Sequence, residues 1–180
     1  MVYLFMADGF EEVEGLTVVD ILRRAGVEIQ TVSIMKRRNV ISSHQIELMA
    51  DILFEEIKEE PEMLILPGGI PGTPNLKAHE GLGTLIRQCA EKEVYLAAIC
   101  AAPTVYGAMG LLEGKNATCY PGMESELLGA KVSYEPVVVD GRYITSRGLG
   151  TAIDFGLTLT ELLKGKEEAD SIARKIVYER

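Results

Sequence analysis

The sequence predicts an α/β protein with a mostly parallel sheet whose two faces are covered by helices. Three short apolar runs have the length of buried strands, namely Val2–Met6, Glu62–Leu66 and Val94–Ile99. Segments with helical spacing of apolar residues lie between them, and strands that alternate with helices favour parallel pairing. Ligands of such sheets bind at the carboxyl ends of the strands. The turns after these three strands therefore mark the expected position of a site.

The elements at the start of the chain follow from local signals. Gly9 ends the first strand, and a helix is expected from about Glu12 to Ala25 with Gly26 as its stop. The apolar residues of Val27–Ile34 predict a second strand. The segment Val40–Leu48 reads as a small excursion or hairpin.

The central elements are set by two buried strands. The strand Glu62–Leu66 ends in Pro67-Gly68-Gly69, and the pattern after it predicts one helix from about Asn75 to Lys92. The strand Val94–Ile99 leads into a helix expected over Pro103–Leu111, because proline is well tolerated in the first turn of a helix.

The last part of the chain begins with a hairpin signal. Asp140-Gly141 separates the strands expected at Val137–Val139 and Tyr143–Thr145, and this dipeptide favours a two-residue turn. Thr151 is expected to start a helix, with Asp154 as its capping-box partner. A last helix is expected over Glu167–Tyr178.

Composition bounds the class of protein. The chain has 180 residues, of which 47% are hydrophobic, and we expect one domain over residues 1–180. The net charge is −9, so the chain is not expected to have the basic surface that binding to nucleic acid or to an anionic membrane would require. The apolar start at Met1–Met6 is too short for a signal peptide or a membrane span, so a cytoplasmic location is expected. The three cysteines are then expected to be reduced thiols.

Cys100 is the candidate nucleophile. It lies between the end of a buried strand and a proline that suits the first turn of a helix, so it is expected to occupy a sharp turn with its side chain outward. The free N–H groups of a following helix favour a thiolate over a thiol. Cys89 reads as a residue on a helix face and Cys119 as a strand-end residue, and packing is the expected role of both.

Glu14 is an acid on an apolar helix face. It shares one face with Val18, Ile21 and Ala25 at helical spacing. A carboxyl group on a core face should have a raised pKa, and its protonated form can donate a hydrogen bond to a thiolate or to an oxidised sulfur. The alternative is an acid at the start of a helix that reaches solvent at the rim of the sheet. Glu11 and Glu12 are expected to be solvated acids that favour the helix N-terminus.

The opposite side of the same helix is also partly apolar. Val13, Leu16 and Val19 lie there, and a helix with two apolar faces usually has two burial partners. One partner is the sheet. We expect the other to be a second copy of the chain, in a homodimer through this helix.

The Gly68-Gly69 pair allows the backbone to approach a ligand and to present N–H groups. Together with the N–H of Ala101, that of Gly69 could form an oxyanion hole beside Cys100. A double glycine alone is more often a plain tight turn. Its significance here comes from the expected convergence with the thiol.

The two histidines, His44 and His79, both precede Cys100, and Ala101 directly follows it. A cysteine hydrolase or a glutamine amidotransferase generally pairs its cysteine with a histidine as base, so neither class is favoured. His44 could reach the site through the 40–48 excursion or could be an exposed loop residue. His79 is expected at the surface.

Several motifs together resemble the ThiJ/PfpI superfamily, and more closely its branch that contains the parkinsonism-associated DJ redox protein and bacterial relatives. The similarity extends along nearly the whole chain. It rests on five segments: Asp8-Gly9-Phe10-Glu11-Glu12-Val13-Glu14, Val19-Asp20-Ile21-Leu22-Arg23-Arg24-Ala25-Gly26, Leu66-Pro67-Gly68-Gly69, Ala97-Ala98-Ile99-Cys100-Ala101-Ala102-Pro103-Thr104 and Thr145-Ser146-Arg147-Gly148.

The resemblance implies a flavodoxin-like three-layer sandwich that is usually a homodimer. It implies that Cys100 is the reactive, easily oxidised cysteine and that Glu14 is the protonated glutamate that hydrogen-bonds it. Gly69 and Ala101 match the backbone donors beside the thiol. The implied activities are cofactor-free glyoxalase chemistry on small carbonyls, deglycation of glycated amines and thiols, or redox sensing with chaperone-like protection. Hydration of an isocyanide-like substrate and proteolysis are less favoured.

This sequence departs from close relatives at the expected site. Tyr120 stands where they have a histidine near the thiol, and His44 stands where they have an arginine in the excursion. The loss of the histidine puts glyoxalase and deglycase rates in doubt, and either residue could compensate. Leu149 replaces a proline of some relatives. The pattern shows no cluster with metal-ligand spacing, and we expect neither a metal nor an organic cofactor.

Overall fold

The central sheet of the computed structural model, which describes residues 1–92 and 94–179, has seven strands in the order β10-β11-β7-β6-β1-β2-β5. The pair β10–β11 is antiparallel, and the other neighbours are parallel. The predicted mostly parallel sheet is therefore confirmed. The strands are β1 Val2–Met6, β2 Ile29–Ser33, β5 Ile52–Leu53, β6 Met63–Leu66, β7 Tyr95–Ile99, β10 Val137–Asp140 and β11 Tyr143–Ser146.

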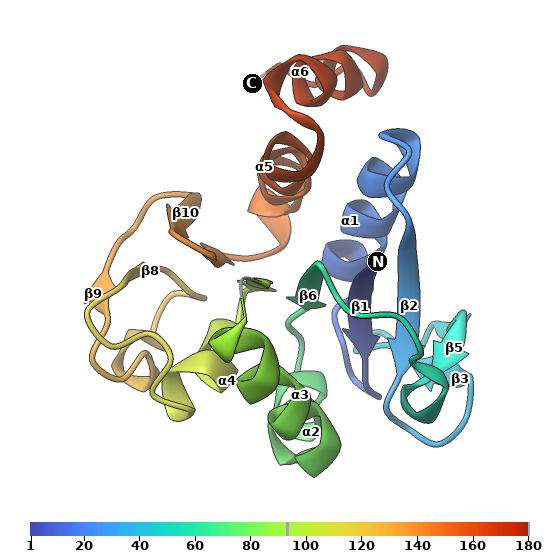
Figure 1. Cartoon of the computed structure of the whole chain (residues 1–180), viewed down its shortest axis with the longest axis vertical. Coiled ribbons are helices and arrows are strands. Elements are labelled where there is room, and N and C mark those ends of the chain that lie inside the picture. Colours follow the sequence, from blue (N-terminus) through green and yellow to red (C-terminus); the bar gives the residue numbers. More distant parts are fainter. Residues whose placement is uncertain (93, 180) are drawn as a thin grey trace.

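Helices cover both faces of this sheet, which gives the expected three layers (Figure 1). On one face lie α1 (Glu12–Arg24) and α5 (Ala152–Lys164), and α6 (Lys166–Lys175) packs against α5. The opposite face carries α2, α3 and α4. Their bounds are Gly72–Ala78, Glu80–Glu91 and Pro103–Ala108. Each layer between helices and sheet holds its own apolar core.

Strand β1 shows how the two cores are built. Successive side chains of a strand point to opposite faces, so Leu4 packs in the core beneath α1 while Phe5 packs in the core beneath α3. Both side chains are fully buried. Because β1 pairs with β2 on one side and with β6 on the other, its carboxyl end lies in the middle of the sheet edge.

Short strands and 3₁₀ turns lie outside the helices and the long strands of the central sheet. The predicted excursion is an antiparallel hairpin of β3 (Asn39–Ile41) and β4 (Glu47–Met49), and β8 (Asn116–Ala117) pairs with β9 (Lys131–Val132). The described residues also form the 3₁₀ turns η1 Phe54–Glu56, η2 Glu124–Glu126 and η3 Leu149–Thr151. The short β5–η1 segment was not predicted.

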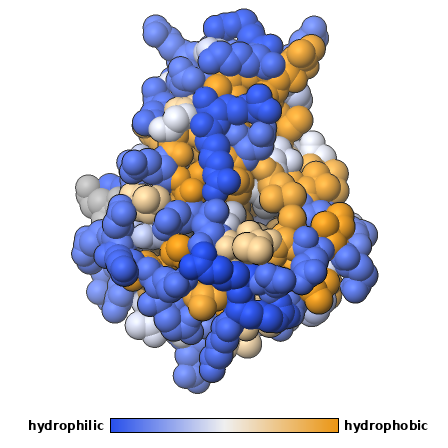
Figure 2. All heavy atoms as spheres, turned by 90° about the vertical axis from the view of Figure 1, so that its right-hand side faces the viewer, coloured by the Kyte–Doolittle hydropathy of each residue, from blue (hydrophilic) through white to orange (hydrophobic). Residues whose placement is uncertain are grey.

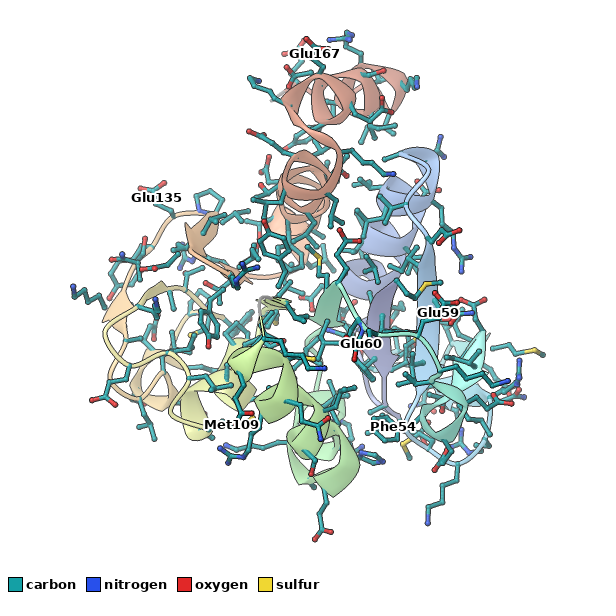
Figure 3. All side chains as sticks on the ribbon, viewed as in Figure 1. Phe54, Glu59, Glu60, Met109, Glu135 and Glu167 are labelled. Carbon is teal, nitrogen blue, oxygen red and sulfur yellow. The ribbon has the colours of Figure 1, made fainter. Side chains whose placement is uncertain are left out.

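His79 corrects the prediction of one long helix over Asn75–Lys92. The chain there forms two helices, and His79 between them has an extended backbone. Its Nδ1 accepts a hydrogen bond from the N–H of Leu82 at 3.0 Å, so the imidazole caps α3. Its ring also lies edge-on to Phe54, with 4.7 Å between ring centroids, and Figure 3 labels Phe54. The side chain expected at the surface is half-buried and structural.

Thr151 corrects a second detail. It precedes α5 as predicted, but its side chain makes no capping bond to that helix. The hydroxyl of Thr151 instead donates to the carbonyl of Gly148 at 2.9 Å and accepts from its N–H at 3.1 Å. The threonine therefore closes the turn before the helix, and the expected capping box with Asp154 does not form.

None of the helices in the described ranges combines the length and the apolar character needed to cross a membrane.

Candidate active site

The turns after β1, β6 and β7 meet at one edge of the sheet, as the order of the elements predicts. The N–H of Glu11, which follows β1, donates to the carbonyl of Gly68, which follows β6, at 2.9 Å. Gly68 in turn packs against Cys100, which follows β7. Parallel strands in register bring three segments far apart in sequence to one place.

Cys100 occupies a strained turn. Its φ angle is +64°, in the left-handed region that costs a non-glycine residue about 1–2 kcal/mol. Its N–H donates to the carbonyl of Ser146 at 2.9 Å, which ties the turn to β11. The side chain is half-buried, so the sulfur stands at a sharp turn as predicted and is partly accessible. Strain held at one reactive residue is typical of a functional site.

Glu14 lies on the core-facing side of α1, and its residue surface is only 1% exposed. The alternative of a carboxyl that reaches solvent is therefore wrong. Its Oε2 accepts a hydrogen bond from the N–H of Gly68 at 2.9 Å, and the carboxyl group is also hydrogen-bonded to Cys100. Burial raises the pKa of Glu14 to about 7, and the nearby Glu11 carboxylate adds to the rise.

The structure corrects the expectation of a thiolate. Burial, followed by the charge and the hydrogen bond of Glu14, raises the pKa of the Cys100 thiol to about 12. The helix α4 that follows has only six residues and begins three positions later, so its dipole offers little compensation. Cys100 and Glu14 therefore act as a coupled pair. When Glu14 is ionised it can accept the thiol proton, and this transfer forms a thiolate without changing the total charge of the pair.

Two backbone N–H groups support the sulfur. Those of Ala101 and Gly69 donate to Cys100 and oppose the rise of its pKa. Glycine is required at both positions of the pair that follows β6. A Cβ on Gly68 would lie 2.6 Å from the Cβ of Cys100, and one on Gly69 would lie 2.4 Å from the N of Glu11. The missing side chains allow the backbone to lie against the thiol.

Tyr120 is the other predicted pocket residue that the structure brings to the site. Its N–H donates to the carbonyl of Cys100 at 2.8 Å. Its ring lies beside Gly148, whose backbone also adjoins Glu14. The Tyr120 side chain is half exposed, so its ring forms part of the outer wall next to Cys100.

His44 does not join the thiol. Its described contacts are with the hairpin and the start of α1: Nδ1 lies 2.9 Å from Oε1 of Glu12, 3.6 Å from Oε2 of Glu11 and 3.1 Å from Oγ of Ser43. The imidazole therefore orders the acids of the first helical turn. Ser43 was not singled out in the sequence, where no pattern distinguishes it from a loop serine.

Glu12 corrects another expectation, since it is buried and not solvated. Burial alone would raise its pKa, but hydrogen bonds from its own backbone, Ser42 and His44 lower it overall. Glu11 is mostly buried, and its Oε1 has no hydrogen-bond partner among the described residues. Glu11, Glu12 and His44 each offer an atom within 4.8 Å of the others. His44 is hydrogen-bonded to Glu12, and the hydroxyl of Ser43 donates to both acids, so these contacts account for the cluster and we assign no metal to it.

Cys89 and Cys119 are buried in the core beneath α3 and α4. Burial raises the pKa of each thiol to about 11. Their packing role is confirmed.

Comparisons with known proteins agree with this architecture. The model of the DJ-1/PfpI family matches residues 1–162. The chain is 34% identical to protein dj-1beta of Drosophila melanogaster, over 97% of this chain and 95% of that protein. It is 29% identical to the glutathione-independent glyoxalase DJR-1.2 of Caenorhabditis elegans, over 92% of this chain and 89% of that one.

Two further comparisons concern length and structure. The chain is 37% identical to protein DJ-1 homolog B of Arabidopsis thaliana over 96% of its own length but spans only 40% of that plant protein. The solved structure of Toxoplasma gondii DJ-1 described as oxidized superposes with a TM-score of 0.96, at 31% identity and over 99% of this chain and 98% of that one. With the match of the family model over nine tenths of its length, this chain belongs to the DJ-1/PfpI family.

Proposed function

We propose that this protein is a cofactor-independent glyoxalase that converts small α-oxoaldehydes such as methylglyoxal to 2-hydroxy acids. The observation that carries this proposal is the hydrogen-bonded pair of Cys100 and Glu14, in which burial raises the pKa of the acid to about 7. An acid–base group is most effective when its pKa lies near the working pH. The relative named a glutathione-independent glyoxalase supports the proposal.

The reaction follows from the positions of these groups. The Cys100 sulfur bonds to the aldehyde carbon while the thiol proton passes through Glu14 to the aldehyde oxygen, which gives a hemithioacetal. Glu14 then removes the proton from that carbon and returns it to the neighbouring carbonyl carbon, while the hydroxyl proton of the hemithioacetal passes to the neighbouring oxygen. The carbon bonded to sulfur thereby becomes a carbonyl, and the product is the thioester of a 2-hydroxy acid. Water hydrolyses the thioester, and this step releases the acid and restores the thiol.

The backbone donors have a role at the oxygen of the hemithioacetal and of the thioester. The N–H groups of Gly69 and Ala101 are directed at Cys100, so an oxygen on the carbon bonded to sulfur would lie within their reach. Fixed backbone donors need no rearrangement during the reaction.

The test is a substrate panel on the purified chain. We expect lactate from methylglyoxal, well above the rate in buffer, and no cleavage of casein. Glycated amines and thiols are included because deglycation uses the same nucleophile. Absence of lactate, together with release of free amine from a glycated substrate, would favour deglycase activity over glyoxalase activity. Inactivity on the whole panel would contradict an enzyme of either kind.

A second candidate function is that of an oxidation sensor, in which Cys100 is the residue that becomes oxidised. The observation that favours it is the half-buried sulfur beside Glu14, since a protonated carboxyl can donate a hydrogen bond to a sulfinate oxygen. A solved relative with the same fold is described as oxidized. The three free cysteines suit a reducing compartment, and we propose the cytoplasm as the location.

We also propose that two copies of the chain associate through α1. Val13 and Leu16 on this helix are about two-fifths exposed, and the adjoining hairpin exposes Ile41, Ile46 and Met49. Figure 2, which views the side of β2 and β5, shows apolar side chains among the charged ones on this face. Val19, also predicted on this face, is buried within the chain.

Sedimentation velocity tests the association. The chain is expected to sediment as a dimer at micromolar concentration, and Leu16→Glu is expected to shift it to a monomer because a charge would then lie within an apolar contact. Gln88→Glu introduces the same charge at an exposed position of α3, on the opposite face of the sheet, and should leave the dimer intact. A wild-type monomer would contradict the proposal.

A further inference from the structure

Gly148 adjoins both the ring of Tyr120 and the carboxyl group of Glu14. A Cβ on Gly148 would lie 3.5 Å from Cδ2 and 3.9 Å from Cε2 of Tyr120, and 3.9 Å from Oε1 of Glu14. These are ordinary van der Waals distances. Gly148 is buried, whereas the Tyr120 side chain is 50% exposed. The exposed ring and the buried acid therefore both lie within van der Waals reach of one side-chain position.

The two oxygens of Glu14 have different surroundings. Oε2 accepts the N–H of Gly68 from the interior side. Oε1 and the Tyr120 ring both adjoin the space in front of Gly148 that a side chain would otherwise occupy. The backbone of Tyr120 is fixed by its hydrogen bond to the Cys100 carbonyl, which holds the base of the ring over the site. An apolar ring at this position excludes water from one side of a carboxyl group, and loss of water favours the neutral acid.

We propose that the Tyr120 ring is an apolar cover over the Oε1 side of Glu14, and that Tyr120 is a positioning residue which keeps this acid protonated through its ring and not through its hydroxyl. The role concerns the protonation of Glu14 alone. It does not depend on whether Cys100 turns over a carbonyl or becomes oxidised.

The other groups around Glu14 stay in place in the test. On α1 the facing charge is Glu11, which is held with Glu12 near Ser43 and His44. On the turn after β7 the titratable group that faces Glu14 is the Cys100 thiol. The segment before Gly148 carries Arg147, whose guanidinium lies 5.9 Å from the centre of the Tyr134 ring. Substitution of Tyr120 therefore changes the solvation of Glu14 without removing a charged partner.

The experiment titrates Glu14 directly, by ¹³C NMR of protein labelled at the glutamate carboxyl carbon, with Glu14→Gln to identify the resonance. Tyr120→Phe should titrate like the wild type because it keeps the ring. Tyr120→Ala should lower the midpoint by about one pH unit, a part of the several units that full burial produces. An unchanged midpoint in Tyr120→Ala, or an equal shift in Tyr120→Phe, would overturn the proposal.

Gly148→Ala supplies a second, independent variant. The φ angle of Gly148 is 161°, which is extended backbone that alanine adopts. Its methyl group would add apolar cover beside Oε1, so the midpoint should rise or stay, and a fall would contradict the inference. In the double variant Tyr120→Ala/Gly148→Ala the methyl group should recover part of the shift. Circular dichroism and thermal unfolding of each variant confirm that the fold is intact before it is titrated.

Discussion

Replacement of Cys100 by serine is expected to reduce lactate formation from methylglyoxal to the rate in buffer, a loss of about 10³-fold or more. A serine hydroxyl is a far weaker nucleophile than a thiol unless a strong base activates it. The base available here is Glu14, whose pKa of about 7 lies far below that of an alcohol. The hydroxyl therefore stays protonated and does not attack the aldehyde.

The fold should tolerate this change. Serine is close to cysteine in size, and the backbone at Cys100 already holds the left-handed φ of +64° through the hydrogen bond of its N–H to Ser146. Cys89→Ala is the matched control, because Cys89 lies on α3, in the core on the far side of the sheet. That variant should keep its activity. Full activity in Cys100→Ser would show that another residue supplies the nucleophile.

The same pair of variants distinguishes an enzyme from an oxidation sensor. After mild peroxide, mass spectrometry should place the added oxygen atoms on the peptide that contains Cys100, and Cys89→Ala should not change this. Oxidation concentrated on Cys100 together with no product from any carbonyl substrate would favour the sensor. Product formation that peroxide abolishes would favour the enzyme.

Much of the fold could be predicted because its strands are short apolar runs with clear ends. Asp140-Gly141 gives the hairpin of β10 and β11, with Gly141 at φ +62°. The break at His79 was missed because apolar spacing continues across it, and a side-chain cap by an imidazole leaves no mark in that spacing. Strand β5 has only two residues, and its pairing with β2 creates it.

For the site, the sequence predicted the positions of the residues better than their burial and protonation. The position of Glu14 follows from helical spacing, and its burial confirms that reasoning. The prediction of a thiolate at Cys100 was wrong because the sequence shows a following helix but not how strongly burial removes water from the sulfur, which is the largest cause of its raised pKa. Glu12 was missed for the same reason, since its burial depends on the hairpin that carries Ser42, Ser43 and His44. Tertiary contacts, not local pattern, decide the charge of these groups.

Glu14→Gln should remove a pH dependence of stability that the wild type shows. The pKa of Glu14 is raised from 4.5 to about 7 in the folded chain, so the folded state holds its proton more tightly than the unfolded state does. This contribution is complete below about pH 4.5 and is lost as the pH rises through about 7. The free energy of unfolding of the wild type should therefore fall by about 2–3 kcal/mol from about pH 5 to about pH 8, relative to Glu14→Gln.

Urea unfolding of both proteins at the two pH values measures this difference. Glutamine keeps an oxygen that can accept the N–H of Gly68 and an amide that can face Cys100, so the packing should survive. Glu12→Gln is the matched control: it is also buried, but its pKa is lowered, so its removal should change the pH dependence with the opposite sign. Parallel curves for wild type and Glu14→Gln would show that Glu14 is not protonated in the folded chain.

The effect on activity should be larger than the effect on stability. An amide neither accepts the thiol proton nor moves a proton between the two carbons of the hemithioacetal, so lactate formation by Glu14→Gln should fall by about 10²–10⁴-fold. Glu12→Gln should stay near the wild-type rate, since its described contacts lie with His44 and the hairpin serines and not with the thiol. Equal losses in both variants would indicate that general damage to α1, and not proton transfer by Glu14, causes the defect.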